Sequence, residues 1–233
     1  MSPRATPLRA RHRAGGACGF TLVELLVAIS VLALIAALSW RGVDGMMRTR
    51  DALGARSDQL QTLQTALAQW GADLDAMQTL PGQTAIDWNG QVLRIVRRAP
   101  GNSAEGLRVV AWSSRNTDGG VRWLRWQSAP VTGRAALAAA WEQAAQWAQS
   151  PVAELRQRET PVAPMTAWRI YFFRDNAWTN PMSSGVTQGV PGGATAAEPP
   201  QGVRLELELP AGAPVAGLLT RDWVRPTLSG GKS

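Results

Sequence analysis

The sequence of 233 residues contains almost no cysteine or histidine, and this scarcity limits the chemistry that the protein can perform. The single cysteine is Cys18 and the single histidine is His12, and both precede residue 20. A chain that lost its first 19 residues would have neither. Such a chain has no disulfide, no thiolate nucleophile, no histidine-based triad and no metal site made from histidine or cysteine.

Charged residues are also sparse, at 18% of the chain against 45% hydrophobic residues. This balance predicts that most of the chain folds, and the length suits one globular domain plus an anchor. The formal net charge is +7, but residues 1–19 contain four arginines and no acidic residue. The remainder has 20 basic and 17 acidic residues, a net charge of +3. Bulk charge therefore does not favour a nucleic acid as a partner.

A long apolar run covers residues 20–39, FTLVELLVAISVLALIAALS, in which Glu24 is the only charge. Twenty helical residues extend about 30 Å, the thickness of a bilayer core. Arginines precede the run and none lies inside it. The positive-inside rule then predicts a cytoplasmic N-terminus and an exported remainder, so the chain is expected to cross the inner membrane once.

Three ordinary explanations of this run fit less well. A secretory signal peptide has a shorter apolar core and a cleavage site after it. A lipoprotein signal places the apolar run before its cysteine, whereas Cys18 follows the polar stretch RHRAGGA. An uncleaved anchor leaves Glu24 unexplained, because a carboxylate within a membrane segment costs a few kcal/mol and usually has a function. Glu24 could also lie among the lipid headgroups without a role.

The stretch from Gly19 to Leu25, GFTLVEL, resembles the type III signal of type IV prepilins and type II secretion pseudopilins. In that family a membrane aspartyl protease, the prepilin peptidase, cuts after the glycine, methylates the new N-terminal amine and leaves the apolar helix in place. The resemblance implies cleavage between Gly19 and Phe20, N-methylation of Phe20, and Glu24 as fifth residue of the mature chain. Pairing of this carboxylate with a neighbouring subunit's amine would neutralise both groups and set the axial register of a filament.

A single apolar stripe predicts that the helix continues beyond the membrane segment. Its members recur at spacings of three, four or seven residues: Leu53, Leu60, Leu63, Leu67, Trp70, Leu74 and Met77. Pro81-Gly82 ends the pattern, so residues 20–78 are expected to form one helix whose 40–80 portion is amphipathic and covers a sheet. Three glycines, Gly42, Gly45 and Gly54, predict a bend or a local break.

Residues 81–228 are expected to form a periplasmic, β-rich domain. Short β-branched and aromatic segments predict strands at 85–88, 91–97, 107–113, 121–127, 167–174 and 202–209. Asp118-Gly119-Gly120 predicts a hairpin turn. The alanine-rich stretch 133–149 predicts a short helix or an ordered insertion, residues 181–201 a loop, and 229–233 a frayed tail. The fold class is α+β and pilin-like: a long N-terminal helix packed on a C-terminal antiparallel sheet.

The order of features after residue 166 is similar to the end of minor pseudopilin J of type II secretion. An aromatic strand and turn falls on Trp168–Trp178, an alternating-leucine strand on Gly202–Leu209 and a closing strand on Gly217–Val224. The similarity implies a structural role at the tip of a periplasmic pseudopilus, with minor pseudopilins of the I and K types, a major pseudopilin and an inner-membrane assembly platform as partners. The alternative is a minor type IV pilin of the W type, in a retractable surface fibre for adhesion or DNA uptake.

No residue pattern predicts a catalytic, cofactor or metal site, so the protein is expected not to be an enzyme. The terminal Gly230-Gly231-Lys232-Ser233 resembles the end of a phosphate-binding loop but has proline where that motif needs glycine. The scattered aspartates, Asp73 and Asp75 at the end of the helix and Asp87 and Asp118 in turns, lack the spacing of a calcium loop. Alternation of tryptophan and arginine over residues 122–126 could stack single-stranded DNA, but core packing of the tryptophans with partly solvated arginines is favoured.

Overall fold

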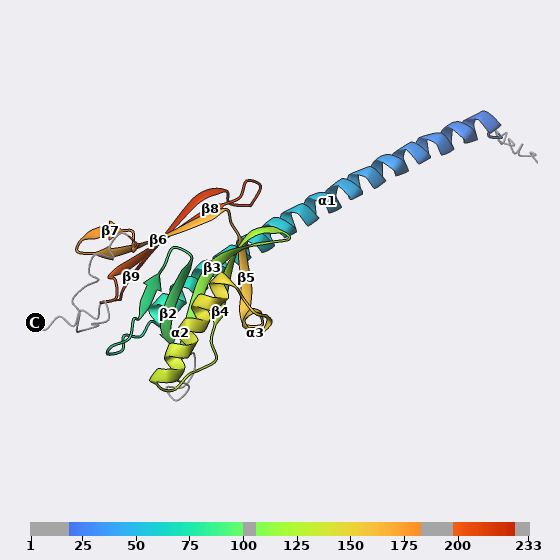
Figure 1. Ribbon diagram of the computed structural model, residues 1–233. Helices are drawn as coiled ribbons and strands as arrows, with labels where there is room; N and C mark the ends of the chain where they lie inside the picture. Colours follow the sequence, from blue (N-terminus) through green and yellow to red (C-terminus); the bar gives the residue numbers. More distant parts are fainter. Residues whose placement is uncertain (1–18, 100–105, 183–197, 227–233) are drawn as a thin grey trace, which may run out of the picture. The chain divides into compact units, whose positions relative to one another are not determined.

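The computed structural model describes residues 19–99, 106–182 and 198–226. Residues 1–18 of the predicted leader, most of the predicted loop at 181–201 and the predicted tail at 229–233 lie outside the described residues. The chain forms two compact units, one ending at Leu53 and the other beginning at Gly54. Figure 1 shows the long helix α1 (Leu22–Asp75), which contributes to both units, and the antiparallel strands that follow it. The α+β, pilin-like fold class is confirmed.

Helix α1 runs without interruption through Gly42, Gly45 and Gly54, so the predicted break is wrong. The glycines lower helix propensity, but alanine, leucine, methionine and arginine around them are good helix formers and no proline intervenes. The helix ends at Asp75, three residues before the predicted end. The chain leaves the helix there because the Gln78 N–H donates to the Val96 carbonyl at 2.9 Å and Met77 pairs with Arg97, which joins the chain to a strand.

The β-rich part contains two sheets where the sequence predicted one. The five-stranded sheet has the order β1-β2-β3-β4-β5 and the four-stranded sheet the order β7-β6-β8-β9, with every pairing antiparallel. The strands of the first sheet are β1 (Ile86–Trp88), β2 (Val92–Arg98), β3 (Leu107–Thr117), β4 (Gly120–Gln127) and β5 (Glu159–Pro164). Those of the second sheet are β6 (Ala167–Arg174), β7 (Ala177–Thr179), β8 (Gly202–Leu209) and β9 (Gly217–Val224).

All six predicted strands and the hairpin turn are present. Thr117 pairs with Gly120, so Asp118-Gly119 forms a two-residue turn between β3 and β4. The predictions missed β5 because Pro161 and Pro164 argue against a central strand, and β5 indeed lies at the edge of its sheet. The stretch at 133–149 forms a helix, α2 (Arg134–Gln149), followed by the short α3 (Ala153–Arg156).

The two faces of the five-stranded sheet are covered by different helices. One face packs with the C-terminal part of α1 and with the four-stranded sheet in a single core, which includes Trp70, Leu74, Leu93 and Val203. The apolar stripe packs against this core from Leu63 onward, whereas Leu53 is 63% exposed. The other face packs against α2 through a second cluster: Val92, Val96, Val109, Ala111, Leu124, Trp126, Leu137, Ala140, Trp141, Ala144, Trp147 and Leu155.

Tryptophans join the two sheets. The rings of Trp88 and Trp168 meet edge to face with centroids 4.6 Å apart, and Trp168 also lies 6.3 Å from Trp123. Trp112 and Trp123 are 4.4 Å apart. Trp168 belongs to the second sheet and the other three to the first, so the aromatic cluster fills the space between sheets.

Candidate functional site

The processing motif precedes and begins helix α1. Gly19 and Phe20 precede the helix, and Phe20 is 81% exposed. Thr21 caps the helix, because its Oγ1 accepts a hydrogen bond from the Glu24 N–H at 3.3 Å. Threonine followed three residues later by glutamate is the spacing of a capping box, a signal in the sequence that the predictions missed. Glu24 therefore lies in the first turn, where the helix dipole favours a negative charge.

The first half of α1 presents an apolar surface that no described residue covers. Its exposed large side chains are Leu22, Val23, Leu25, Leu26, Val27, Ile29, Val31, Leu32, Leu34, Ile35 and Leu38. Among the described residues, α1 is the one helix long and apolar enough to cross a membrane, judged by length and composition. The helix supports single-pass anchoring in a membrane.

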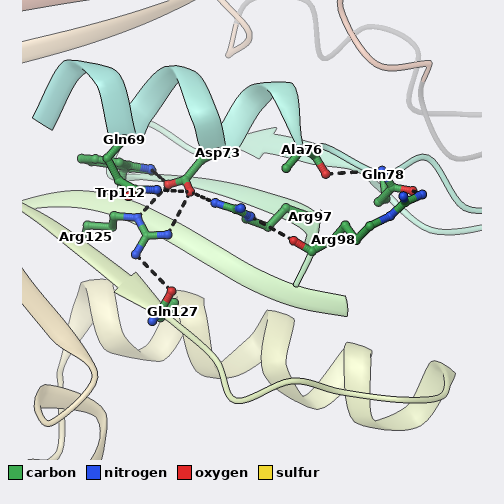
Figure 2. Close-up of polar contacts among 9 residues, drawn as sticks. All are labelled: Gln69, Asp73, Ala76, Gln78, Arg97, Arg98, Trp112, Arg125 and Gln127. Atoms are coloured by element: carbon green, nitrogen blue, oxygen red, sulfur yellow. Dashed lines mark hydrogen bonds and ion pairs between the residues drawn. The ribbon is translucent and has the colours of Figure 1, made fainter. Parts of the chain in front are cut away.

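At its other end α1 is fixed to the five-stranded sheet by a buried carboxylate. Asp73 is fully buried, and Figure 2 shows side chains of three neighbouring strands converging on it. Arg125 donates two hydrogen bonds, from Nε to Oδ2 at 2.7 Å and from Nη2 to Oδ1 at 2.8 Å. Trp112 donates its indole N–H to Oδ2 at 2.9 Å, and Arg97 forms an ion pair with Oδ1. Gln69, one turn earlier on α1, donates to Oδ1 at 3.0 Å.

The position of Asp73 explains why it needs so many partners. A carboxylate in the last turn of a helix is disfavoured by the helix dipole, and a buried unpaired carboxylate is far more costly. Two guanidinium groups and an indole N–H offset both effects, and all three come from strands β2, β3 and β4. The cluster therefore specifies where the end of α1 lies on this sheet.

The predictions placed Asp73 among scattered carboxylates, but one signal could have found it. Trp70, Asp73 and Leu74 are spaced by three and one residues, which places them on one face of the helix. An aspartate on an otherwise apolar face is buried, and a buried carboxylate requires donors. The sequence does not reveal which arginines supply them, because β2 and β4 lie about 25 and 50 residues later in the chain.

The next carboxylate contacts the other sheet. Asp75 accepts a hydrogen bond at 2.7 Å from the indole N–H of Trp223 on β9. The last turn of α1 thus contacts the five-stranded sheet through Asp73 and the four-stranded sheet through Asp75. In each case the donor includes a tryptophan whose ring lies in or beside the core.

A second polar cluster joins α2 to the opposite face of the five-stranded sheet. Glu159 accepts from the Trp147 indole N–H at 2.7 Å and from Arg115 at 2.8 Å and 3.1 Å. Arg115 also donates to the Trp147 carbonyl at 3.2 Å, and its guanidinium lies over the Trp147 ring. Nearby, the Arg94 guanidinium stacks 4.5 Å from the centre of the Trp141 ring. The helix at 133–149 is therefore an integral layer of the domain.

The tryptophan-rich segment of β4 is part of the core. Trp123 packs on the α1 side and Trp126 on the α2 side, and both are fully buried. Arg125, on the same side as Trp123, bonds to Asp73. The favoured interpretation of core packing is confirmed for these two rings, and neither is available to stack a nucleotide base.

On the outer face of the four-stranded sheet, Arg204 and Asp222 form a bidentate pair with two contacts of 2.7 Å. The hydrogen bonds from Arg204 lower the pKa of Asp222 below its ordinary value, against the opposing effect of partial burial. The same hydrogen bonds raise the pKa of Arg204. Both side chains remain about one-third exposed, so solvent screens the pair.

We expect Asp222→Asn to reduce stability slightly, by less than about 1 kcal/mol at neutral pH. Because the folded-state pKa is lowered, the contribution of Asp222 is present above its unfolded pKa of about 3.8 and is lost as the pH falls through the folded value. The free energies of unfolding of the two proteins should converge below about pH 4. Urea unfolding between pH 3 and pH 7 measures this, and a difference that stays constant over that range would contradict it.

Among the described residues, no group of three or more histidine, cysteine, aspartate or glutamate side chains is arranged to hold a metal ion. The polar clusters at Asp73 and Glu159 are satisfied by arginine and tryptophan donors within the domain. These clusters connect helices to strands within the domain. The candidate features for interaction with other molecules are the exposed N-terminal motif and the exposed apolar half of α1.

Comparison with protein families identifies the prokaryotic N-terminal methylation motif over residues 16–40, which includes Gly19, Phe20 and Glu24. A search of curated proteins found no significant match. The motif implies processing by a prepilin peptidase and assembly into a pilus-like filament. Together with the long apolar helix and the antiparallel β-sheet domain, it supports a protein of the type IV pilin or pseudopilin type.

Proposed function

We propose that the protein is a minor pseudopilin, most similar to the J type, in the tip and initiation complex of a type II secretion pseudopilus that supports protein export across the outer membrane. The observation that carries this proposal is the methylation motif on a continuous helix that changes character along its length. Its first half exposes apolar side chains, and its last turns are fixed to a β-rich domain.

In this proposal each part of the chain has a distinct task. The prepilin peptidase cuts between Gly19 and Phe20 and methylates Phe20. The apolar half of α1 first anchors the subunit in the inner membrane and later packs against other helices in the filament. The folded domain stays on the periplasmic side, where it meets minor pseudopilins of the I and K types and the major pseudopilin, while the inner-membrane platform drives assembly.

Glu24 sets the register in this arrangement. A carboxylate among packed apolar helices is costly unless a cation lies beside it, and the amine of a neighbouring Phe20 supplies one. Glu24 lies in the first turn of α1, close to the helix N-terminus. In the proposed filament, the Phe20 amine of a neighbouring subunit lies at this level. The pair then favours a single axial offset between subunits.

The decisive experiment determines the N-terminal residue and the intact mass of the protein in membranes with and without a prepilin peptidase. We expect a chain beginning with N-methylated Phe20 in the first strain and an uncut precursor in the second. A leader retained in both strains, or a terminus beyond residue 39, would show that the proposal is wrong. A minor type IV pilin shares the cut, so loss of protein secretion, with surface fibres unaffected, in a deletion strain assigns the protein to the pseudopilus.

Gly19→Val is expected to leave at least nine-tenths of the protein uncut. A glycine before the cut lets the protease approach the backbone closely, and a β-branched side chain occupies that space. The matched control is Gly42→Ala, because an added Cβ there meets nothing within 4 Å. The fraction of precursor is read from intact mass, and full processing of Gly19→Val would contradict the predicted cleavage position.

A further inference from the structure

Strand β9 (Gly217–Val224) is a long edge strand whose charged residues are Arg221 and Asp222, and Asp222 is paired with Arg204 of the neighbouring strand. It lies at the end of the four-stranded sheet, has eight residues and contains neither proline nor lysine. The other three edges are protected: β1 and β7 have three residues each, and β5 carries Pro161 and Pro164. Natural sheets usually blunt exposed edges, so a long edge without proline, lysine or a break in register indicates a place where another strand pairs.

The backbone of β9 can be assigned group by group. The Arg225 N–H donates to the Gln201 carbonyl at 2.8 Å, and the pairing with β8 continues in register from Val224 to Gly217. Because antiparallel hydrogen-bonded pairs alternate, the odd-numbered residues of β9 direct their N–H and C=O groups at β8. Leu218, Thr220, Asp222 and Val224 direct theirs at the open edge, and no described residue bonds to them there.

The side chains along this edge specify the chemistry of an incoming strand. Leu218 is 61% exposed and Val224 is 69% exposed, which provides apolar contacts near the two ends of the strand. Asp222 between them is already neutralised by Arg204. On the opposite face of the strand, Arg221 is exposed and makes no ion pair with any described residue. An acidic side chain directly across from Arg221 on an added strand would form a cross-strand ion pair with it.

We infer that β9 receives an extended segment of a different co-assembling subunit, with apolar residues opposite Leu218 and Val224 and an acidic residue opposite Arg221. A second copy that pairs antiparallel, the more stable arrangement per residue, does not meet this requirement. In any antiparallel pairing of two β9 edges, the even-numbered residues bond to one another, so Arg221 faces Gly217, Leu219, Arg221 or Trp223 and never an acid. The identity of the partner class rests on the proposed function, since a subunit of the same filament lies alongside in the assembly.

The test uses the full chain in its own membranes, with the photo-crosslinker p-benzoylphenylalanine at Val224 and, as control, at the exposed Gln143 of α2. We expect an adduct from position 224 whose partner peptide is an extended, acid-containing segment of another filament subunit. Thr220→Pro removes one outward N–H while leaving the bonds to β8, and should lower the adduct yield by about fivefold. Thr220→Val keeps that N–H and should leave the yield unchanged. Arg221→Glu should lower it as well.

Three outcomes would overturn the inference: an adduct to a second copy of this chain, an adduct only to this chain's own residues, or an adduct whose yield Thr220→Pro does not change. The intact mass of each variant is recorded in the same samples. If the chain is cut at Phe20 and enters filaments but β9 yields none of the expected adduct, the strand-addition inference fails alone. If the leader is retained in every sample, the proposed function fails first, and the two failures are thus distinguishable.

Discussion

Asp73→Ala is expected to destabilise the folded domain by about 3–5 kcal/mol, the range typical of breaking a buried ion pair by removing one partner. The substitution leaves the guanidinium groups of Arg97 and Arg125 and the indole N–H of Trp112 without their shared acceptor. Both arginine side chains are only about one-tenth exposed, so water replaces the lost carboxylate poorly. Denaturant unfolding of the full chain in detergent, followed by tryptophan fluorescence, measures the change.

The matched control for this prediction is Asp58→Ala, four turns earlier on the same helix. Asp58 is exposed, and its removal is expected to change stability by less than about 0.5 kcal/mol. Asp73→Asn, which keeps one acceptor oxygen, should fall between the two. If Asp73→Ala and Asp58→Ala unfold at the same denaturant concentration, the buried cluster contributes no net stability and the reasoning above is wrong.

Glu24→Leu is expected to lower incorporation of the subunit into filaments by at least tenfold while leaving membrane insertion intact. The substitution makes the first turn of α1 wholly apolar, so anchoring in the bilayer becomes easier. Without this charge, the packed helices no longer favour one axial offset between subunits over other offsets. A tenfold loss of incorporation corresponds to about 1.4 kcal/mol per subunit. Cross-linking intact membranes and comparing the yield of adducts between this subunit and other filament subunits in the wild type and the variant measures the effect.

Thr21→Ala separates the charge of Glu24 from its part in the helix cap. This variant removes the Oγ1 that accepts the Glu24 N–H, at a cost of about 1 kcal/mol to the first turn, but keeps the carboxylate. If Glu24 acts through pairing, Thr21→Ala assembles almost normally. Equal loss of assembly in Thr21→Ala and Glu24→Leu would instead assign Glu24 a role in helix capping.

The sequence was most informative where a pattern is local. The length of α1 follows from an apolar run and a stripe of leucines, and the hairpin after β3 follows from Asp118-Gly119. These features depend on neighbouring residues, whose preferences can be read directly. The prediction of a helix break at three glycines was wrong because the propensity cost of each glycine is small against the cooperativity of a 54-residue helix.

The features that the sequence did not predict depend on residues far apart in the chain. The sequence did not separate the two sheets, because β4 and β6 have similar residue patterns and differ only in the strands with which they pair. The Asp73 cluster joins residues separated by up to 52 positions. Position on an apolar helix face could have indicated that Asp73 is buried, but only the folded chain shows which donors satisfy it. The residues of the processing motif, unlike those of the Asp73 cluster, are contiguous in the chain. A short local pattern was therefore sufficient to predict the motif.

The two carboxylates at the end of α1 also determine how the domain bears mechanical load. A force along α1 is expected to load the contacts of Asp73 to β2, β3 and β4 together, because all three strands donate to the same carboxylate. Two residues further on, Asp75 passes part of the same force to β9 in the other sheet. Tension along α1 is therefore expected to load both sheets at once, through two residues of the same helical turn.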